Sequence, residues 1–323
     1  MKLGIDFGTT NSAVAVLRPD GRPEIVELTP GERLQRSVIH CTTDGQVRFG
    51  NAAFKQYLED DLSGRFLRSI KAFLPYDVPP TTLGRNRYTF PELITAYLVF
   101  LIERATHVLG EPVESVVVGR PVHFHADPER DEEARNRLLG ALEAAGVPDC
   151  QLQFEPVAAA YRFEHDLTTD RVVLVGDFGG GTSDFAVLRV GPGRLHAADR
   201  AADVLGTSGV AKAGNALDAV FMSTFLMEYF GRGAMYRMRY TDEMVPWVHQ
   251  IHREVLRLYD LHSLKNDKLH RTLHWLEQRL SSPLSIQRLR KLIFDDLGYP
   301  LAWAIEASKR TFSSQAQTQF RFD

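Results

Sequence analysis

Two stretches of the chain share one pattern of apolar, acidic and small residues. Val172–Asp177 is a β-branched run that ends in aspartate, three glycines follow Phe178, and alternation resumes over Ser183–Val190. Residues 3–17 repeat this plan, with an apolar run ending in Asp-Phe-Gly, small hydroxyl residues, and a second apolar run. Each stretch predicts two strands joined by a tight turn. The repetition predicts a duplicated unit.

Between the two hairpins, the spacing of apolar residues predicts alternating strands and helices. Positions that recur every three or four residues predict helices, and short β-branched runs predict strands. The predicted strands are 24–28, 35–39, 47–50, 113–118 and 150–154, and the predicted helices are 51–59, 91–109, 131–145 and 157–165. Strands that alternate with helices in this order indicate an α/β unit with a mixed sheet.

The second copy of the unit is predicted to be shorter. Strands are expected at 172–177, 183–190 and about 194–200, a helix at 216–230, an almost wholly helical stretch at 241–312, and a last strand at 313–322. Its sheet should have three strands where the first has five. Unpaired strand edges attract other chains, so we expect a loosened lobe, self-association or a protein partner.

Length and charge narrow the class of protein. A chain of 323 residues is longer than the chains that usually fold around a single hydrophobic core. We therefore predict a first lobe at 1–171, with a small insertion at 29–90, and an incomplete second lobe at 172–323, mainly helical from 213. The net charge of −3 favours neither nucleic acid nor an anionic membrane as a partner. No apolar run reaches membrane-spanning length and no leader opens the chain, so a cytoplasmic protein is expected.

The two turns carry residue types that suit a phosphate site. Gly179, Gly180 and Gly181 have no Cβ, so backbone N–H groups there can approach an anion closely. Asp6 and Asp177 stand at strand ends, where carboxylates can hold a hydrated Mg²⁺ against phosphate oxygens. One such turn alone would equally fit an ordinary glycine-rich hairpin. Two turns that face each other would clamp a polyphosphate and its metal.

Together these motifs resemble the nucleotide-binding domain of DnaK-type heat-shock chaperones, in the actin and sugar-kinase superfamily, and most of all its short YegD-like branch. The resemblance covers most of residues 1–230 and returns at 306–313; it rests on Asp6–Ser12, Lys71, Val116–Pro121, Glu155–Ala160, Asp177–Asp184 and Glu306–Ser313. The fold that it implies is a duplicated RNase H-like, or actin-like ATPase, α/β fold. Two lobes would flank a nucleotide cleft, with the second lobe incomplete.

The resemblance implies ATP or ADP and Mg²⁺ as cofactors. It assigns Mg²⁺, held through water, to Asp6 and Asp177. It assigns catalysis to Lys71, Glu155, Asp177 and Thr182. It assigns nucleotide binding to Gly8, Thr9, Thr10, Asn11, Gly179, Gly180, Gly181, Thr182, Gly214, Glu306, Lys309, Arg310 and Ser313.

Elementary chemistry supports these roles. Phosphoryl transfer to water needs neutralised charge at the γ-phosphate and a water held in line. Lys71 would add the charge, and Glu155, helped by Asp184 or Thr182, would orient the water. A lysine among apolar neighbours is otherwise a snorkelling surface residue. The helical residues at 306, 309, 310 and 313 share one face, which would contact adenine and ribose or simply be solvated.

Three functions fit the sequence. One is a slow ATPase of chaperone type without a peptide-binding domain, because the β-rich module of the family has no counterpart here. The others are a non-catalytic nucleotide-binding scaffold and a small-molecule, sugar-type kinase. The family's Gly-Gly-x-x-Arg turn is not found in the last third, so weak nucleotide affinity is expected. Five histidines of the helical part would form a metal site or belong to ordinary surface helices: His249, His252, His262, His270 and His274.

Overall fold

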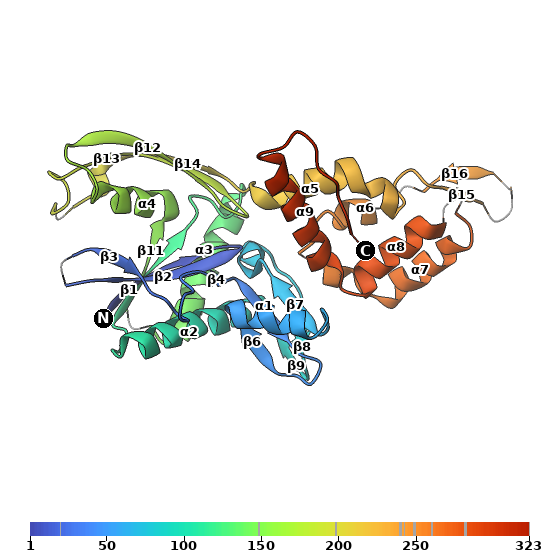
Figure 1. The fold of residues 1–323 in the computed structure, drawn as a ribbon, viewed down its shortest axis with the longest axis horizontal. Coiled ribbons are helices and arrows are strands. Elements are labelled where there is room, and N and C mark those ends of the chain that lie inside the picture. The colour runs from blue at the N-terminus through green and yellow to red at the C-terminus, as the bar shows by residue number, and fades with distance from the viewer. Residues whose placement is uncertain are drawn as a thin grey trace. The chain divides into compact units, whose positions relative to one another are not determined.

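The structure, a computed structural model, describes residues 1–19, 21–147, 149–197, 199–238, 241, 243–247, 250–259, 261–280 and 283–322. The chain forms two compact units, Met1–Gly214 and Asn215–Asp323 (Figure 1). The predicted α/β architecture with a repeated hairpin is confirmed. The proposed lobe boundary at residue 171 stays a prediction.

A mixed sheet occupies the N-terminal part of the first unit. Its strands run in the order β11-β10-β1-β2-β3, with β4 paired to β2. The bounds are β1 Lys2–Phe7, β2 Asn11–Leu17, β3 Pro23–Ile25, β4 Gln35–Arg36, β10 Ser115–Arg120 and β11 Asp149–Phe154. β1 is antiparallel to β2 and parallel to β10, as the order of elements predicts. β3 is shorter than the strand predicted at 24–28, because the Glu27 carboxylate accepts a hydrogen bond from the Gly31 N–H and closes a turn.

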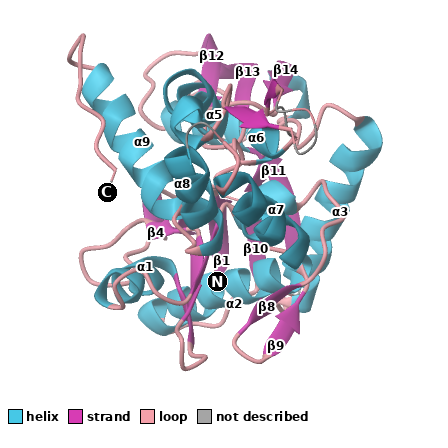
Figure 2. Cartoon of the chain, turned by 90° about the vertical axis from the view of Figure 1, so that its right-hand side faces the viewer, coloured by secondary structure: helices cyan, strands magenta, loops and turns pink. Residues whose placement is uncertain are grey.

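Three helices belong to this first sheet and to its connection with the second: α2 Phe90–Leu109, α3 Pro128–Ala144 and α4 Glu155–Glu164. Thr89 and Glu92 form a capping box at the start of α2, and Gly110, with φ 73°, ends the helix in the left-handed region. The apolar stripe of α2 packs on the sheet, where the Tyr97 ring lies 5.8 Å from that of Phe7. Figure 2 shows α3 beside β10 and β11.

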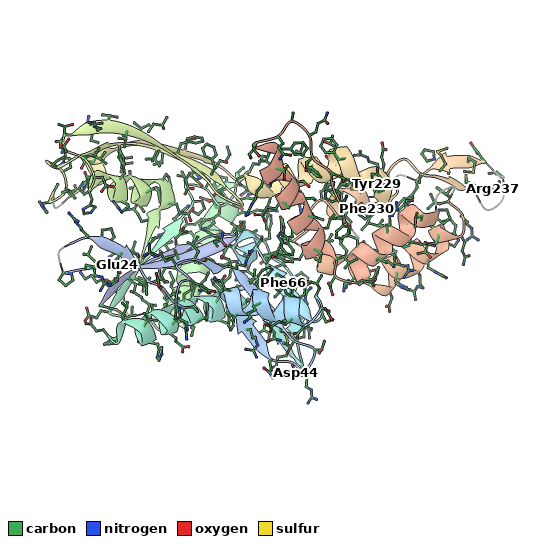
Figure 3. All side chains as sticks on the ribbon, viewed as in Figure 1. Glu24, Asp44, Phe66, Tyr229, Phe230 and Arg237 are labelled. Atoms are coloured by element: carbon green, nitrogen blue, oxygen red, sulfur yellow. The ribbon has the colours of Figure 1, made fainter. Side chains whose placement is uncertain are left out.

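The predicted insertion at 29–90 has a small sheet of its own, ordered β6-β5-β7. Its elements are β5 Val38–Cys41, β6 Val47–Phe49, α1 Gly50–Glu59, β7 Arg65–Arg68, a 3-10 helix Ile70–Phe73, β8 Thr81–Leu83 and β9 Asn86–Tyr88. Tyr57 of α1 is fully buried and stacks on Phe66 of β7 at 4.3 Å (Figure 3). This packing places the 3-10 helix that carries Lys71.

The second sheet has three antiparallel strands in the order β12-β13-β14: β12 Arg171–Phe178, β13 Ser183–Val190 and β14 Val204–Val210. Helix α4 covers one face, burying Val157 and Ala160 against Ala186 and Leu188. The strand predicted at 194–200 is wrong. Arg200 instead bonds both carboxylate oxygens of Glu164 in α4, so the chain folds onto the helix before it enters β14.

The second unit is mostly helical around one apolar core. Helix α5 Gly214–Phe221 continues as a π-helical turn Met222–Leu226 and a 3-10 helix Met227–Phe230, which confirms the helix predicted at 216–230. The further elements are β15 Met235–Arg237, β16 Met244–Pro246, α6 Ile251–Glu254, a 3-10 helix Leu261–Leu264, α7 Asp267–Glu277, α8 Pro283–Phe294 and α9 Gly298–Phe312. Phe230, which is labelled in Figure 3, lies in this core. Trp247 and Leu289 belong to the same core.

Two expectations for this unit are wrong. The stretch 241–312 is not almost wholly helical, because β16 pairs with β15. No strand forms at 313–322: α9 ends at Phe312, and the Phe320 ring lies 5.7 Å from that of Phe221. Burial of Phe320 and Phe322 against the helical core replaces the strand pairing that the alternation predicted.

The structure bears on two further expectations. His249 lies outside the described residues, and the described part of the chain holds no group of three His, Cys, Asp or Glu side chains that could bind a metal. A membrane-spanning helix, long and apolar enough to cross a bilayer, is absent from the described residues.

A buried ion-pair network generates a stability prediction. The Glu164 and Asp203 side chains are 1% and 3% exposed, and Arg200 bonds both. Replacing Arg200 with Met would leave two buried carboxylates without this partner. We expect the free energy of unfolding to fall by about 3–5 kcal/mol in urea denaturation.

Arg162→Met is the matched control. Its partner Asp166 is 64% exposed, so this change should stay within about 0.5 kcal/mol of the parent protein. If the free energy of unfolding fell equally in the two variants, the ion pairs of Arg200 with Glu164 and Asp203 would not be important for stability.

Candidate functional site

The first loop, residues 8–11 between β1 and β2, is held by Ser37. The Ser37 Oγ donates to the Gly8 carbonyl at 2.6 Å, and the Ser37 N–H donates to the Thr10 carbonyl at 2.9 Å. A Cβ added to Gly8 would stand 2.2 Å from the Asn11 carbonyl oxygen, so glycine is required there. Sequence reasoning missed Ser37, whose only signal was a small hydroxyl residue inside a predicted strand.

The second loop, residues 179–182, repeats this geometry between β12 and β13. Phe178 pairs with Ser183 as Phe7 pairs with Ser12, so the two hairpins share one register. The Gly179 N–H donates to the Thr182 carbonyl at 2.9 Å and closes the turn. The Gly214 N–H donates to the Gly179 carbonyl at 3.2 Å, so the last residue of the first unit is bonded to this loop.

The two loops are in direct contact. A Cβ added to Gly180 would lie 2.6 Å from Thr10 Oγ1, and one added to Gly181 would lie 3.0 Å from Thr9 Oγ1. A side chain at either position would press against the hydroxyl of Thr10 or Thr9. The fold therefore brings together two turns that lie about 170 positions apart in the sequence, as the duplicated pattern predicted.

Lys71 and Glu155 form a buried ion pair beside the loops. Their Nζ and Oε1 atoms are 2.6 Å apart, and their side chains are only 7% and 16% exposed. Ser69, with φ 55°, precedes the 3-10 helix that carries Lys71. The Lys71 Nζ lies 5.8 Å from the centre of the Phe7 ring. A Cβ at Gly119 would stand 3.1 Å from Glu155 Cγ, so that glycine makes room for the carboxylate. Lys71 is therefore no snorkelling surface residue.

Two carboxylates at the strand ends have raised pKa values. The Asp6 side chain is exposed to solvent, although many protein atoms surround its carboxyl group. The desolvation caused by these atoms raises its pKa from 3.8 to about 6; Lys71 opposes the shift, and Glu155 and Asp177 add to it. Burial raises the pKa of Asp177 as well, helped by Glu155 and Asp184. The charges of Lys71 and Glu155 thus act on both aspartates.

Asp184 links the two sheets of the first unit. It is 1% exposed, and its Oδ1 accepts a hydrogen bond of 2.7 Å from the Val122 N–H, just after β10. Burial raises its pKa, while hydrogen bonds from Thr182 and Val122 oppose that shift. A Cβ at Gly209 would stand 2.4 Å from Asp184 Oδ1. Sequence reasoning named Asp184 as a helper of Glu155; its contact with Val122 had no sequence signal.

This donor set fits a polyphosphate with a divalent cation. The glycine backbone and the Thr9 and Thr10 hydroxyls offer hydrogen-bond donors, and a side chain at Gly180 would fill the space between the loops. Asp6 and Asp177 carry raised pKa values, so a cation nearby would favour their ionised forms. Too few carboxylates of the described residues converge to enclose a metal, so its remaining ligands would be water and phosphate.

The predicted helical part of the site belongs to the second unit. In α9, Glu306 bonds Arg310, and Lys309 Nζ bonds Asp218 of α5. Ser313 caps the helix end, where its Oγ lies 3.4 Å from the Lys309 carbonyl. Asp218 is a partner that sequence reasoning missed. The role of these four residues in binding adenine and ribose stays a prediction.

The raised pKa of Asp6 generates a prediction about pH. The folded chain holds this proton more tightly than the unfolded chain, whose Asp titrates near 3.8, so ionised Asp6 destabilises the fold above pH 6. Asp6→Asn should therefore raise the melting temperature at pH 8 in Mg²⁺-free buffer by roughly 1–3 °C, a figure reduced for solvent contact. The gain should vanish as the pH falls from 6 to 4.

Asp149→Asn, at an exposed acid that starts β11, should leave the melting temperature unchanged at both pH values. A gain for Asp6→Asn that persists at pH 4 would show that charge is not its cause.

Comparison with known proteins places this arrangement in a family. The sequence profile described as Hsp70 protein matches residues 2–74 and 76–242, which include both loops, Lys71 and Glu155. Chaperone protein dnaK1 of Prochlorococcus marinus (strain MIT 9313) is 31% identical over 214 residues, and chaperone protein DnaK of Thermotoga neapolitana is 31% identical over 193 residues. Each comparison covers 59% of this chain and 31% of the relative. The chain thus spans about a third of the length of these curated relatives.

Proposed function

This chain belongs to the Hsp70 family, and from that premise we propose that it binds Mg²⁺·ATP or Mg²⁺·ADP and hydrolyses ATP slowly, as a chaperone-like protein. The observation that carries the proposal is the contact between the two glycine loops, with Gly180 and Gly181 lying on the Thr10 and Thr9 hydroxyls. Two backbone-lined turns and two acidic strand ends form a site for a charged phosphate chain.

Each loop would hold phosphate oxygens through its backbone. In the first loop, Ser37 donates hydrogen bonds to the carbonyls of Gly8 and Thr10. The N–H groups and threonine hydroxyls of the loop would then be the donors to a ligand. In the second loop, the Gly179 N–H donates to the Thr182 carbonyl, and the Gly214 N–H donates to the Gly179 carbonyl. These hydrogen bonds fix the backbone of both turns, so little reordering is needed on binding.

Asp6 and Asp177 would hold the hydrated magnesium. When bound, Mg²⁺ would neutralise negative charge on the phosphates. The raised pKa of Asp6, about 6, means that the carboxylate must release its proton to serve this role at lower pH. Cation affinity should therefore weaken below pH 6.

Lys71 and Glu155 would act at the transferred phosphoryl group. The ammonium group would place positive charge where negative charge develops. The Glu155 carboxylate would orient or deprotonate the attacking water. Thr182 of the second loop or Asp184 of β13 would assist it. The 2.6 Å ion pair fixes the positions of both side chains, which are nearly buried.

The sugar-type kinase and the non-catalytic scaffold are separated from the ATPase by product analysis. An ATPase releases free phosphate, a kinase yields a phosphorylated small molecule, and a scaffold yields neither. Isothermal titration with Mg²⁺·ADP tests nucleotide binding first, and absence of binding at about 1 mM nucleotide with the folded protein would overturn the proposed function.

Glycine substitution tests the loop contact. In Gly180→Ala the added Cβ would press on Thr10 Oγ1, so we expect the affinity for Mg²⁺·ADP to fall by about tenfold or more in isothermal titration. Gly206→Ala in β14 is the matched control, because a Cβ there meets no atom within 4 Å. Equal affinities in the two variants would place the nucleotide elsewhere.

Replacement of Lys71 tests the catalytic assignment. Lys71→Ala should slow phosphate release by on the order of 10²-fold, while nucleotide still binds, if the ammonium acts mainly in the transition state. Lys55→Ala, at a lysine whose side chain is 79% exposed, should keep the parent rate. Unchanged phosphate release by Lys71→Ala would remove this residue from the mechanism.

A further inference from the structure

Three buried hydroxyl groups lie next to the first loop. They belong to Ser12 of β2, to Ser37 between β4 and β5, and to Tyr97 of α2, and these residues are 1%, 1% and 0% exposed. The Oγ atoms of the two serines are 2.9 Å apart, and the Tyr97 hydroxyl donates to the Arg36 carbonyl at 2.8 Å. A buried hydroxyl is costly unless it is hydrogen-bonded, so each of these groups constrains the orientation of its partner.

The direction of the hydrogen bond between the two serines follows from the number of protons. A serine hydroxyl has one proton to donate. Ser37 donates its proton to the Gly8 carbonyl at 2.6 Å, so the proton between the two Oγ atoms comes from Ser12. Ser12 therefore orients the Ser37 hydroxyl, and Ser37 orients the Gly8 carbonyl.

The hydrogen bonds from Ser37 set two peptide units of the first loop. In a planar trans peptide unit, the carbonyl and the N–H of the next residue point in opposite directions. The units of this loop are trans. The bond from Ser37 Oγ to the Gly8 carbonyl therefore turns the Thr9 N–H away from Ser37. The bond from the Ser37 N–H to the Thr10 carbonyl does the same for the Asn11 N–H. Neighbouring N–H groups that point to one side are suited to bind an anion.

Tyr97 fixes the peptide unit that precedes Ser37. The Arg36 carbonyl accepts from the Tyr97 hydroxyl, so the Ser37 N–H in the same unit points the opposite way, to the Thr10 carbonyl. The Tyr97 ring is itself packed against Phe7 at 5.8 Å. The orientation of the first loop thus depends on a hydroxyl that helix α2 supplies.

The second hairpin holds the same carbonyl with a different donor. Gly8 and Gly179 each follow the phenylalanine that ends the first strand of their hairpin, and both hairpins have the same register. The Gly179 carbonyl accepts from the Gly214 N–H, a main-chain donor. This recurrence indicates that the carbonyl has to be held in both turns. In the first turn side chains hold it, so substitution can remove the constraint there.

We propose that Ser12, Ser37 and Tyr97 are positioning residues of the nucleotide site, which orient the first loop for binding the phosphate oxygens of Mg²⁺·ADP or Mg²⁺·ATP. The inference rests on the proposed nucleotide binding. The three hydroxyls act through the main chain of the loop and not by contact with the ligand. Without the Ser37 hydroxyl, the Gly8 carbonyl would lose its donor and could turn its oxygen toward the phosphate oxygens, which would repel it.

Removal of each hydroxyl tests the proposal by isothermal titration with Mg²⁺·ADP. Ser37→Ala should weaken binding by about tenfold and Ser12→Ala by about fivefold, the range for one hydrogen bond. The double variant should lose about tenfold and not about fiftyfold, because the two hydroxyls act as one unit. Tyr97→Phe keeps the packed ring and should lose about threefold.

Thr81→Val is the matched control. It removes a hydroxyl of β8 that is also buried, at 8% exposed, and that accepts a hydrogen bond from Arg65. The affinity for Mg²⁺·ADP should equal that of the parent protein, because this hydroxyl is not bonded to either loop.

A spectroscopic readout needs no nucleotide. In amide NMR spectra of the free chain, Ser37→Ala should shift the signals of Thr9 and Asn11 more than those of the second loop, residues 179–182. The first loop loses a constraint on its peptide units in this variant, whereas the second loop keeps the hydrogen bond from Gly214.

A kinetic readout separates positioning from damage to the fold. The first loop would hold the phosphates equally before and during phosphoryl transfer. Ser37→Ala should therefore raise the KM for ATP by about tenfold and leave kcat within about twofold of the parent value. A fall in kcat at unchanged KM would place Ser37 in the chemical step and overturn the proposal.

Other results would also overturn it. They are a parent-like affinity of Ser37→Ala for Mg²⁺·ADP, losses that multiply in the double variant, and amide shifts spread equally over both loops. Failure of the parent chain itself to bind Mg²⁺·ADP would overturn the proposed function and this role with it. The parent protein thus distinguishes the two failures.

Discussion

The approach of the two glycine loops is the constraint on which the candidate site depends. Gly180 and Gly181 lie so close to Thr10 and Thr9 that an added Cβ would press against the threonine hydroxyls. The approach requires that both hairpins keep one register, and Ser37 and Gly214 hold their turns from outside. It also brings Asp177 close enough to Asp6 to help raise the pKa of the Asp6 carboxyl.

Charge is concentrated around this contact at an energetic cost. Several acids share the space with one ammonium group. The pKa of Asp6 rises to about 6, mainly because surrounding protein atoms hinder its hydration, and the charges of Glu155 and Asp177 add to the shift. Lys71 is bonded to Glu155 and so does not neutralise the other carboxylates fully. Such a cluster is costly for stability and useful for binding cations, which is the usual balance at a functional site.

The duplication also reveals an asymmetry. The same hairpin is buried under α2 and β10 in its first copy and left with an open face in its second. Because both copies have the same hairpin register, the difference lies in what surrounds them and not in the hairpin itself.

The sequence by itself determined the local elements. The alternation over Ser183–Val190 predicted β13 to the residue, and the apolar spacing from residue 91 predicted α2, because a side chain's period follows from the backbone geometry of strand or helix. Glycines beside aspartates predicted both phosphate-type turns. The family resemblance placed Lys71 and Glu155, which local patterns could not single out.

The tertiary structure decided which distant groups meet. Three hydrogen bonds join residues that lie far apart in the sequence, and no local pattern encodes them. They are those of Ser37 with the first loop, of Val122 with Asp184 and of Lys309 with Asp218. The same reason explains the errors. Residues 194–200 and 313–322 alternate like strands. In the first segment, however, Arg200 donates to the buried carboxylate of Glu164. In the second, Phe320 packs against the helical core. A strand needs a partner for its backbone, and whether that partner or a buried contact prevails is settled only when the whole chain has folded.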